Sequence, residues 1–316
     1  MSEVKVTLDN QKPIFMFSGQ GSQKVSMGND LNGSRVAQEV LECASDIFKF
    51  DVFEVMTKGP QEKLDETRYA QPAIVALSLA LCRLLEEQNI TPAACLGFSL
   101  GQVSALYASR MLTLEQTFHL AKRRSEIMSE AATATKGAMC ALLGADEESV
   151  KVLCEECSHG EVLVPANYNC PGQIVISGTV EAIERAKAVW ESQKKRAMML
   201  ATSGAFHSPL MSEAALKFKV YLGGVDFAAP EMPLICNTDA RPLMASDAPD
   251  HLAAHLTCPV NFMQSIALLK NSGATQFVEV GIGGVLLGLM KRIDKSTERT
   301  LIQSVEDVQL FAHNER

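Results

Sequence analysis

The sequence predicts an α/β fold in which a mainly parallel sheet is covered by helices on both faces and carries an inserted antiparallel unit. Short apolar runs of strand length alternate with helical patterns on either side of residues 135–204. Residues 135–204 themselves follow the order βαββαβ, which is that of a ferredoxin-like split unit. The length of 316 residues suits one large domain with such an insertion. We therefore expect residues 1–134 and 205–316 to form a large subdomain and residues 135–204 a small one.

Two buried strands are expected in the first part of the large subdomain. Ile14–Phe17 is a short apolar run that is stopped by a Ser-Gly-Gln-Gly-Ser loop. Ala93–Phe98 is a second such run, and Leu100–Arg110 then resumes helical periodicity. The order strand, sharp turn, helix is therefore predicted around residue 99.

Two long helices are expected beside these strands. Ala73–Glu87 is apolar around most of its circumference, which predicts a central helix that begins just after Pro72. Thr113 and Gln116 have the spacing of a capping box, so a further helix should begin there.

The insertion and the C-terminal part supply the remaining elements. The insertion is expected to contain strand Met139–Leu143, helix Asp146–Cys157, strands Val162–Ala166 and Ile174–Ser177, helix Val180–Gln193 and strand Ala197–Leu200. The later elements are strands Leu234–Cys236 and Gln276–Val280 and helices Ala248–His255, Val260–Leu269 and Val285–Ile293.

Composition and charge exclude several classes of protein. Apolar residues make up 47% and charged residues 21%, which excludes a disordered chain, a collagen and a coiled coil. Because the net charge is −8, we do not expect a broad basic surface that binds nucleic acid. The longest apolar run, Ala73–Cys82, is too short to cross a bilayer, and Met1–Lys12 lacks the apolar stretch of a signal peptide. We therefore expect no nucleic acid and no membrane among the partners.

The cysteines favour a reducing compartment. Nine of them, an odd number, are scattered along the chain, so we expect a cytoplasmic protein. Cys154 and Cys157 form a CxxC with His159 nearby, but no second pair follows at zinc-site spacing and the segment is helical in pattern. Structural thiols are therefore expected, and no metal site.

Ser99 is the candidate nucleophile. It stands at the centre of Gly97-Phe98-Ser99-Leu100-Gly101, a GxSxG between an apolar strand and a helix. A nucleophile elbow needs glycines on both sides because the turn is strained and backbones pass close together. The alternative is a glycine-rich turn with a capping serine.

His207 is the candidate base that a serine nucleophile requires. Of the six histidines, His119 falls inside a predicted helix, His159 in a polar turn, His251 and His255 one turn apart on one helix, and His313 in a polar tail. Only His207 lies in a loop, Gly-Ala-Phe-His-Ser-Pro, that could position a functional group.

Six motifs now identify a resemblance. They are Phe17-Ser18-Gly19-Gln20-Gly21-Ser22-Gln23, Ala70-Gln71-Pro72-Ala73, Gly97-Phe98-Ser99-Leu100-Gly101, Arg123-Arg124-Ser125-Glu126-Ile127-Met128, Asn167-Tyr168-Asn169-Cys170-Pro171-Gly172-Gln173 and Gly204-Ala205-Phe206-His207-Ser208. In this order they resemble the malonyl-CoA:acyl carrier protein transacylases of fatty acid synthesis and the acyltransferase domains of polyketide synthases, over roughly residues 12–303. The resemblance implies a hydrolase-like α/β fold with an inserted ferredoxin-like subdomain, in agreement with the pattern above.

The resemblance also implies the catalytic roles. Ser99 becomes acylated and His207 serves as its base. A backbone carbonyl, and not a carboxylate, would orient His207. This carbonyl would lie near His255, where relatives usually have Gln. The backbone N–H groups of Gln20 and Leu100 would form the oxyanion hole.

Three further residues would line the acyl pocket in the same way. Arg124 matches the family's arginine that binds the malonyl carboxylate, whereas the adjacent Arg123 points away around the helix. Gln71 lines the pocket in relatives. Phe206 occupies the position that in related polyketide acyltransferases distinguishes malonyl (Phe) from methylmalonyl (Ser).

The sequence departs from the family at three places. Phe98 replaces a common His, Gln102 replaces a common Glu, and Gly281-Ile282-Gly283-Gly284 replaces a Gly-Pro-Gly-basic loop. The first two lie beside the site without being reacting groups, while the third removes a basic residue that could contact CoA or the carrier.

The function that the resemblance implies is malonyl transfer from malonyl-CoA to the phosphopantetheine thiol of acyl carrier protein, by a ping-pong mechanism through malonyl-serine. The expected partners are malonyl-CoA and the carrier protein, no cofactor is implied, and we expect a monomer. Because the chain carries no fused modules, a role in fatty acid synthesis is favoured over one in polyketide synthesis. Two alternatives remain: a serine hydrolase or thioesterase that passes acyl groups to water, and an inactive carrier-binding scaffold.

Two basic runs could meet an acidic carrier protein. Lys194-Lys195-Arg196 leads into the last strand of the insertion, and Lys291-Arg292 with Lys295 ends a late helix. Solvated charge at helix ends explains either run equally well.

Overall fold

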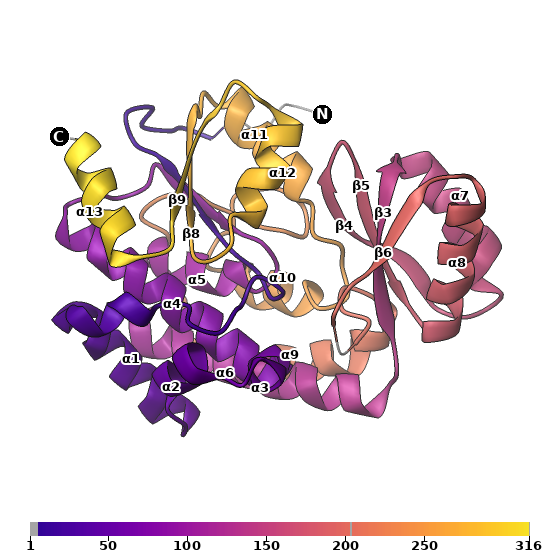
Figure 1. The fold of residues 1–316 in the computed structure, drawn as a ribbon, viewed down its shortest axis with the longest axis horizontal. Helices are drawn as coiled ribbons and strands as arrows, with labels where there is room; N and C mark the ends of the chain where they lie inside the picture. The colour runs from indigo at the N-terminus through magenta and orange to yellow at the C-terminus, as the bar shows by residue number, and fades with distance from the viewer. Residues whose placement is uncertain (1–5, 203, 316) are drawn as a thin grey trace.

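The computed structural model describes residues 6–202 and 204–315 and contains two sheets, A and B (Figure 1). Sheet A has the strand order β7-β2-β1-β8-β9, and every pairing in it is parallel. Its strands are β1 (Ile14–Phe17), β2 (Ala94–Gly97), β7 (Leu234–Ile235), β8 (Gln276–Val280) and β9 (Glu298–Ile302). The predicted parallel sheet of the large subdomain is thus confirmed.

The carboxyl ends of three central strands meet at one edge of sheet A. Phe17, the last residue of β1, pairs with Gly97 on one side and with Val280 on the other. The segments that follow these residues therefore leave the sheet side by side. In open α/β sheets this edge is where ligands bind.

Sheet A is buried on both faces. Phe15 and Phe17 pack into the cluster that contains α4, whereas Ile14 and Met16 pack against Phe262 and its neighbours on the opposite face. Helices α4 (Thr67–Glu87), α1 (Arg35–Phe48), α5 (Gly101–Ala108) and α6 (Leu114–Ala134) cover the first face, and α11 (Phe262–Asn271) and α12 (Val285–Ile293) cover the second. This two-sided burial explains why the central strands β1 and β2 are continuous apolar runs.

The central helix begins earlier than predicted. α4 starts at Thr67, so Pro72 lies inside the helix and not before it. Tyr69 and Ala70 donate their N–H groups to the carbonyl of Glu66, which forms the first turn upstream of the proline. The sequence analysis placed the start of this helix by its apolar residues, so it missed a first turn that contains polar residues. α4 is long and apolar enough to span a membrane, but 83% of its most apolar window is buried inside the fold, as expected of a core helix.

Sheet B is antiparallel, with the order β4-β5-β3-β6. Its elements are β3 (Ala138–Ala145), α7 (Glu147–Ser158), β4 (Leu163–Cys170), β5 (Gly172–Gly178), α8 (Val180–Ser192) and β6 (Arg196–Met199). Order and topology are those of the predicted ferredoxin-like unit, and Figure 1 shows α7 and α8 together on the side of sheet B away from sheet A. The exact boundaries at residues 135 and 204 stay a prediction.

The two faces of sheet B serve different cores. Cys140 and Leu142 pack against Trp190 and other residues of α7 and α8. Met139 and Ala141, which alternate with them along β3, belong instead to the main cluster beside sheet A. One face of the small sheet therefore closes over the large subdomain.

Several boundaries differ from the prediction. β4 runs on to Cys170 and meets β5 through a tight turn at Gly172 (φ 75°), whereas the predicted strand ends at Ala166. Val260, predicted to be helical, instead forms a parallel bridge with Asn167. β9 and α13 (Val305–Asn314) were not predicted, so His313 lies in a helix and not in a polar tail.

The remaining elements are shorter or peripheral. They are the 3-10 helices η1 (Asn29–Gly33) and η2 (Pro209–Met211) and the helices α2 (Val52–Lys58), α3 (Gln61–Asp65), α9 (Ser212–Leu222) and α10 (Ala248–Ala254). The capping box predicted at Thr113 and Gln116 is confirmed at the start of α6.

Candidate active site

Ser99 occupies a sharp turn between β2 and α5. Its φ of 52° is in the left-handed region, as a strained elbow requires. A Cβ on Gly97 would lie 1.8 Å from the carbonyl carbon of Gly101, and one on Gly101 would lie 2.0 Å from the carbonyl oxygen of Phe17. Both glycines are therefore needed for the backbones to pass, and Ser99 is presented half-buried at the edge of sheet A.

His207 lies beside Ser99. Its Nε2 is 2.8 Å from Ser99 Oγ, while Nδ1 is 2.8 Å from the carbonyl oxygen of His255 and 3.1 Å from that of Cys258. Because carbonyl oxygens only accept, Nδ1 carries the proton and Nε2 is left to accept the Ser99 hydroxyl proton. The position of the His255 carbonyl agrees with the role that the resemblance implied, whichever side chain residue 255 carries.

His207 is held in its neutral, basic form. Burial, followed by the positive charge of Arg124, lowers its pKa from 6.5 to about 4. The pKa of the neighbouring His255 is also lowered well below its usual value, chiefly by burial. Neither imidazole is therefore protonated at neutral pH.

This shift predicts an acid limit well below that of an ordinary histidine. A neutral His207 is needed to accept the serine proton, so kcat/KM for acylation should hold as pH falls through 6.5 and decline only as it approaches the folded pKa of about 4. The folded state should lose stability as pH falls from about 6.5 to about 4, because over this range the unfolded chain binds a proton at His207 that the folded chain does not. The measurement is a pH profile of single-turnover acylation. Enzyme returned to neutral pH should regain full activity, and a limb centred near 6.5 would contradict the assignment.

Arg124 is buried next to the nucleophile. Its side chain extends from α6, Nη1 donates to Gln71 Oε1 at 2.8 Å, and Nη2 lies 3.3 Å from Ser99 Oγ. Within the described ranges it forms no ion pair, and burial lowers its pKa to about 10. A desolvated cation without a carboxylate partner is costly, so this site favours an anionic ligand. Arg123 is half-exposed and pairs with Glu126 at 3.6 Å.

Gln71, predicted for the pocket, lies beside Gln20, predicted for the oxyanion hole. Gln71 Nε2 is 3.4 Å from Gln20 Oε1, and Gln20 Nε2 donates to Thr67 Oγ1 at 3.0 Å. Over residues 6–202 and 204–315, the backbone N–H groups of Gln20 and Leu100 donate no hydrogen bond. Both groups are thus available to an oxyanion.

These side chains enclose a cavity of about 80 Å³. Its lining includes every pocket residue predicted from the sequence except His255, which contributes through its carbonyl. It also contains residues that sequence reasoning did not select: Met128, Met139, Asn167, Leu200 and Thr202. Four of these belong to the insertion or its exit, so sheet B supplies one wall of the acyl site.

Asn237 is the functional residue that the sequence analysis missed. Its side chain accepts from the Ser99 N–H at 2.8 Å and donates to the Gly97 carbonyl at 2.6 Å. Its own N–H donates to Gln102 Oε1 at 2.8 Å. Asn237 follows β7, the neighbour of β2, and therefore fastens both arms of the elbow from the adjacent strand. Its place directly after a predicted strand was the one available signal.

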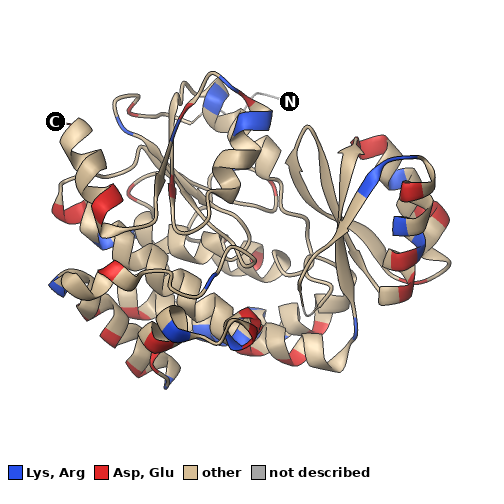
Figure 2. Cartoon of the chain, in the orientation of Figure 1, with Lys and Arg blue, Asp and Glu red and all other residues tan. Residues whose placement is uncertain are grey.

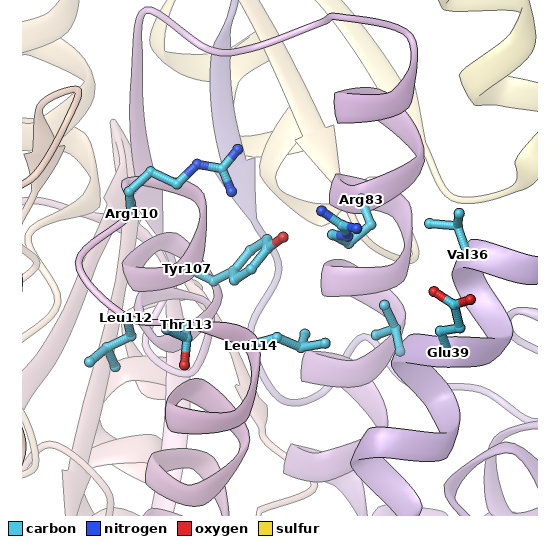
Figure 3. Close-up of a pocket in the computed structure, with 9 residues that line it drawn as sticks. Val36, Glu39, Arg83, Tyr107, Arg110, Leu112, Thr113 and Leu114 are labelled. Carbon is cyan, nitrogen blue, oxygen red and sulfur yellow. The ribbon is translucent and has the colours of Figure 1, made fainter.

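A larger hollow of about 440 Å³ lies elsewhere, between α1, α4 and the segment that joins α5 to α6 (Figure 3). Arg83, Tyr107 and Arg110 surround it. All three bind the Glu86 carboxylate, at 3.2, 3.1 and 3.0 Å respectively. These groups already satisfy one another, and neither Ser99 nor His207 lines this hollow, so we do not assign the reaction to it.

The CxxC cysteines are structural, as predicted. Cys154 and Cys157 are buried on the inner side of α7. Burial raises the pKa of Cys154 to about 12, which leaves it a protonated thiol at neutral pH.

Comparison with known proteins agrees with this geometry. A sequence-family profile described as "Acyl transferase domain" matches residues 14–312. The chain belongs to the acyl transferase family. It is 37% identical over 303 residues to the malonyl CoA-acyl carrier protein transacylase of Bacillus subtilis, covering 95% of this chain and 96% of the relative.

Solved structures of relatives share the fold of this acyl transferase. A malonyl-CoA:acyl carrier protein transacylase from Xanthomonas oryzae superimposes with a TM-score of 0.92 at 36% identity, over 96% of this chain and 98% of the other. A malonyl-transacylase in complex with a type II polyketide synthase acyl-carrier protein gives 0.92 at 33% identity, over 96% and 99%.

The departures from the family pattern in this acyl transferase have local explanations. Phe98 packs edge-on against Phe262, with ring centroids 5.6 Å apart, and so joins the elbow to α11. Gln102 is fully buried and accepts the Asn237 N–H, a role that needs only a side-chain oxygen. Gly284 precedes α12 with φ 67°, a conformation that suits glycine.

Proposed function

We propose that this acyl transferase moves a malonyl group from malonyl-CoA to the phosphopantetheine thiol of an acyl carrier protein, with malonyl-Ser99 as the intermediate. The observation that carries the proposal is Arg124, a buried cation without an acidic partner, 3.3 Å from the nucleophile. It is placed to bind the carboxylate that distinguishes malonyl from acetyl. The names of the relatives support the same substrates.

The first half-reaction follows from the contacts of Ser99. His207 Nε2 takes the hydroxyl proton as Oγ attacks the thioester carbonyl. The N–H groups of Gln20 and Leu100 receive the oxyanion, and losing one such donor costs about 100- to 1000-fold in rate. The carbon–sulfur bond then breaks, and His207 returns the proton to the CoA thiolate. A pantetheine thiol reverses these steps in the second half-reaction, so none of them needs a cofactor.

A labelling experiment tests this proposal against hydrolysis and against an inactive scaffold. Incubation with radiolabelled malonyl-CoA should give a stable acyl-enzyme that a pantetheine thiol discharges to a labelled thioester. Rapid release of free malonate would support hydrolysis, and an unlabelled enzyme would support the scaffold. The formed Ser99–His207 contact already favours a catalytic function.

Phe206 is proposed to restrict the acyl group at its α-carbon. Its ring is buried and lines the cavity next to His207. We expect the wild type to prefer malonyl-CoA to methylmalonyl-CoA, and Phe206→Ser to narrow the ratio of the two kcat/KM values, because a smaller side chain leaves room for a methyl group. One methyl group in such a pocket corresponds to about 10- to 200-fold in specificity. Equal turnover of the two thioesters by the wild type would refute this role.

Carrier docking is proposed to use local basic charge, since an acidic carrier is repelled by the net charge of −8. Figure 2 shows basic residues at the end of α12 and at the start of β6. Arg292 already donates to the carbonyl oxygens of Pro171 and Gly172, which leaves Lys291 and Lys295 exposed at that helix end. On the other run, Lys194 and Arg196 are exposed, whereas Lys195 stacks on Trp190.

Charge reversal tests this docking surface. Lys194→Glu with Arg196→Glu, or Lys291→Glu with Lys295→Glu, should raise KM for the carrier. Each exposed ion pair with the carrier contributes up to about 1 kcal/mol, so each pair lost should raise KM by up to about fivefold. Acylation by malonyl-CoA should be unchanged, and added salt should weaken carrier use by the wild type. Lys217→Glu, on α9, is the control. If neither double variant nor salt affects carrier use, docking is not electrostatic.

We further propose that the enzyme is a cytoplasmic monomer with subdomain boundaries at residues 135 and 204. Ser99, His207 and Arg124 meet within one chain, so the proposed reaction needs no residue of a second copy. All nine cysteines are free thiols, which suits a reducing compartment.

A further inference from the structure

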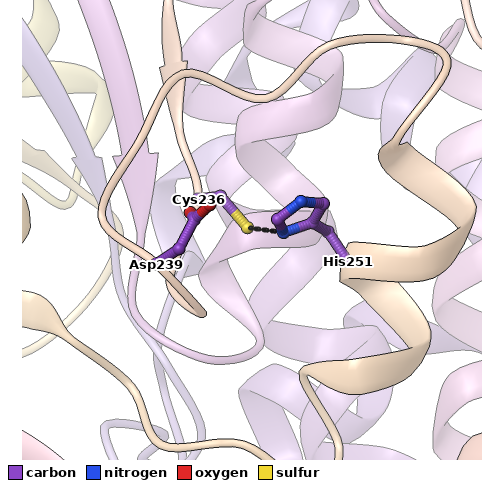
Figure 4. A group of neighbouring side chains, drawn as sticks. All are labelled: Cys236, Asp239 and His251. Carbon is purple, nitrogen blue, oxygen red and sulfur yellow. Dashed lines mark hydrogen bonds between the residues drawn. The ribbon is translucent and has the colours of Figure 1, made fainter. Parts of the chain in front are cut away.

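Three potential metal ligands lie together between the end of β7 and α10 (Figure 4). Cys236 directly follows β7, Asp239 lies in the turn after it, and His251 is on α10. Their ligand atoms all lie within 4.8 Å of one another. The proposed acyl transfer uses none of the three, and no spacing in the sequence had selected them.

The two nitrogen and sulfur ligands already have the separation that a tetrahedral zinc ion needs. Cys236 Sγ is 3.5 Å from His251 Nδ1. Zinc bonds of about 2.3 Å to sulfur and about 2.0 Å to nitrogen, at a tetrahedral angle, put these two atoms about 3.5 Å apart. An ion can therefore replace the proton shared between them without a movement of β7 against α10.

The three side chains differ in their exposure to solvent. Cys236 is 1% exposed, His251 is half-buried and Asp239 is exposed. The thiol thus forms the floor of a site that opens to solvent on the carboxylate side, where water can complete the coordination. A thiolate and an imidazole select zinc over magnesium or calcium, which prefer oxygen ligands.

We propose that Cys236, Asp239 and His251 form a binding site for a zinc ion. On binding, the Cys236 thiol releases its proton to solvent and the thiolate forms the metal–sulfur bond. The Thr238 hydroxyl, 2.8 Å from His251 Nδ1 and 3.1 Å from Cys236 Sγ, gives up its contact with the nitrogen. The ion then links the turn after β7 to α10.

The site adjoins the residue that fastens the elbow. Cys236 precedes Asn237, and Gln102 Nε2 donates to Cys236 Sγ at 3.6 Å while Gln102 Oε1 accepts the Asn237 N–H. A bound ion therefore holds the segment from which Asn237 reaches the Ser99 N–H.

Cobalt(II) is the spectroscopic probe for this site. Titration of the purified full chain with Co²⁺ should give a thiolate-to-cobalt charge-transfer absorption that saturates at one equivalent and disappears when Zn²⁺ is added. Zinc affinity is then measured by competition with a chromophoric chelator. Zinc should also raise Tm, because a ligand that binds only the folded state stabilises it.

Single variants assign the ligands. Cys236→Ser should abolish the charge-transfer absorption, and His251→Gln and Asp239→Ala should each weaken zinc binding at least tenfold and remove the rise in Tm. Cys43→Ser and His119→Gln, at an unrelated thiol and an exposed imidazole, are the controls and should bind as the wild type does.

Two results would overturn the proposal. One is the absence of a charge-transfer absorption from the wild type. The other is binding that survives His251→Gln or moves with the Cys43 control. Should Cys236→Ser fail to fold, His251→Gln decides alone, since His251 is only half-buried.

Discussion

Ser99→Ala should abolish the covalent malonyl adduct and leave the fold intact. The substitution removes one half-buried hydroxyl whose partners are His207 Nε2 and Arg124 Nη2, and it leaves the glycine-dependent turn unchanged. Where a nucleophile and its base act as a unit, losing the nucleophile lowers kcat by a factor on the order of 10⁶. Intact-mass spectrometry after exposure to malonyl-CoA measures the adduct directly.

A second serine, on the helix that follows the elbow, provides the control. Ser104 lies along α5, and its hydroxyl is buried without a hydrogen-bond partner in the described part of the chain. Ser104→Ala should therefore retain the adduct. A malonyl adduct on Ser99→Ala would remove Ser99 as the nucleophile, and a label mapped to one of the nine cysteines would indicate thiol chemistry.

Arg124→Ala should relax the choice between malonyl and acetyl thioesters. In the proposed role, the guanidinium attracts the malonyl carboxylate, whereas an acetyl group leaves the buried cation unpaired. Truncating one partner of a buried charge pair costs about 2 to 5 kcal/mol. The malonyl to acetyl ratio of kcat/KM should therefore fall at least tenfold, measured on both thioesters with one enzyme preparation.

Arg123→Ala is the matched control, because Arg123 is the adjacent residue on α6 but pairs with Glu126 near the surface. Its selectivity should equal that of the wild type. An unchanged ratio in Arg124→Ala together with a fall in Arg123→Ala would show that the neighbouring arginine binds the carboxylate.

The parts of the fold and site that could be predicted are those with a local signature. Apolar runs located β1, β2 and β8, and the GxSxG between a strand and a helix located the elbow. His207 was selected by its loop and by the resemblance, and the structure brings it to 2.8 Å from a serine 108 residues away. The family is confirmed by the comparisons, whereas the roles of these residues are still predictions.

The parts that could not be predicted depend on contacts between distant segments. Asn237 is an ordinary polar residue after a strand until β7 is known to lie beside β2. Asn167 and Met139 become cavity residues only because one face of sheet B packs against the large subdomain. The start of α4 was misplaced because its polar first turn carries no apolar periodicity.

The bridge between Asn167 and Val260 has a consequence for how this enzyme can diverge. Tyr168 donates its N–H to the Val260 carbonyl, Val260 donates to the Ala166 carbonyl, and the next residue, Asn261, donates to the Asn237 carbonyl. The cavity wall on β4 and the residue that fastens the elbow are thus joined by main-chain bonds, which side-chain substitutions leave in place. Substitutions on α7 and α8, which pack on the other face of sheet B, should therefore leave the link between the cavity wall and the elbow in place.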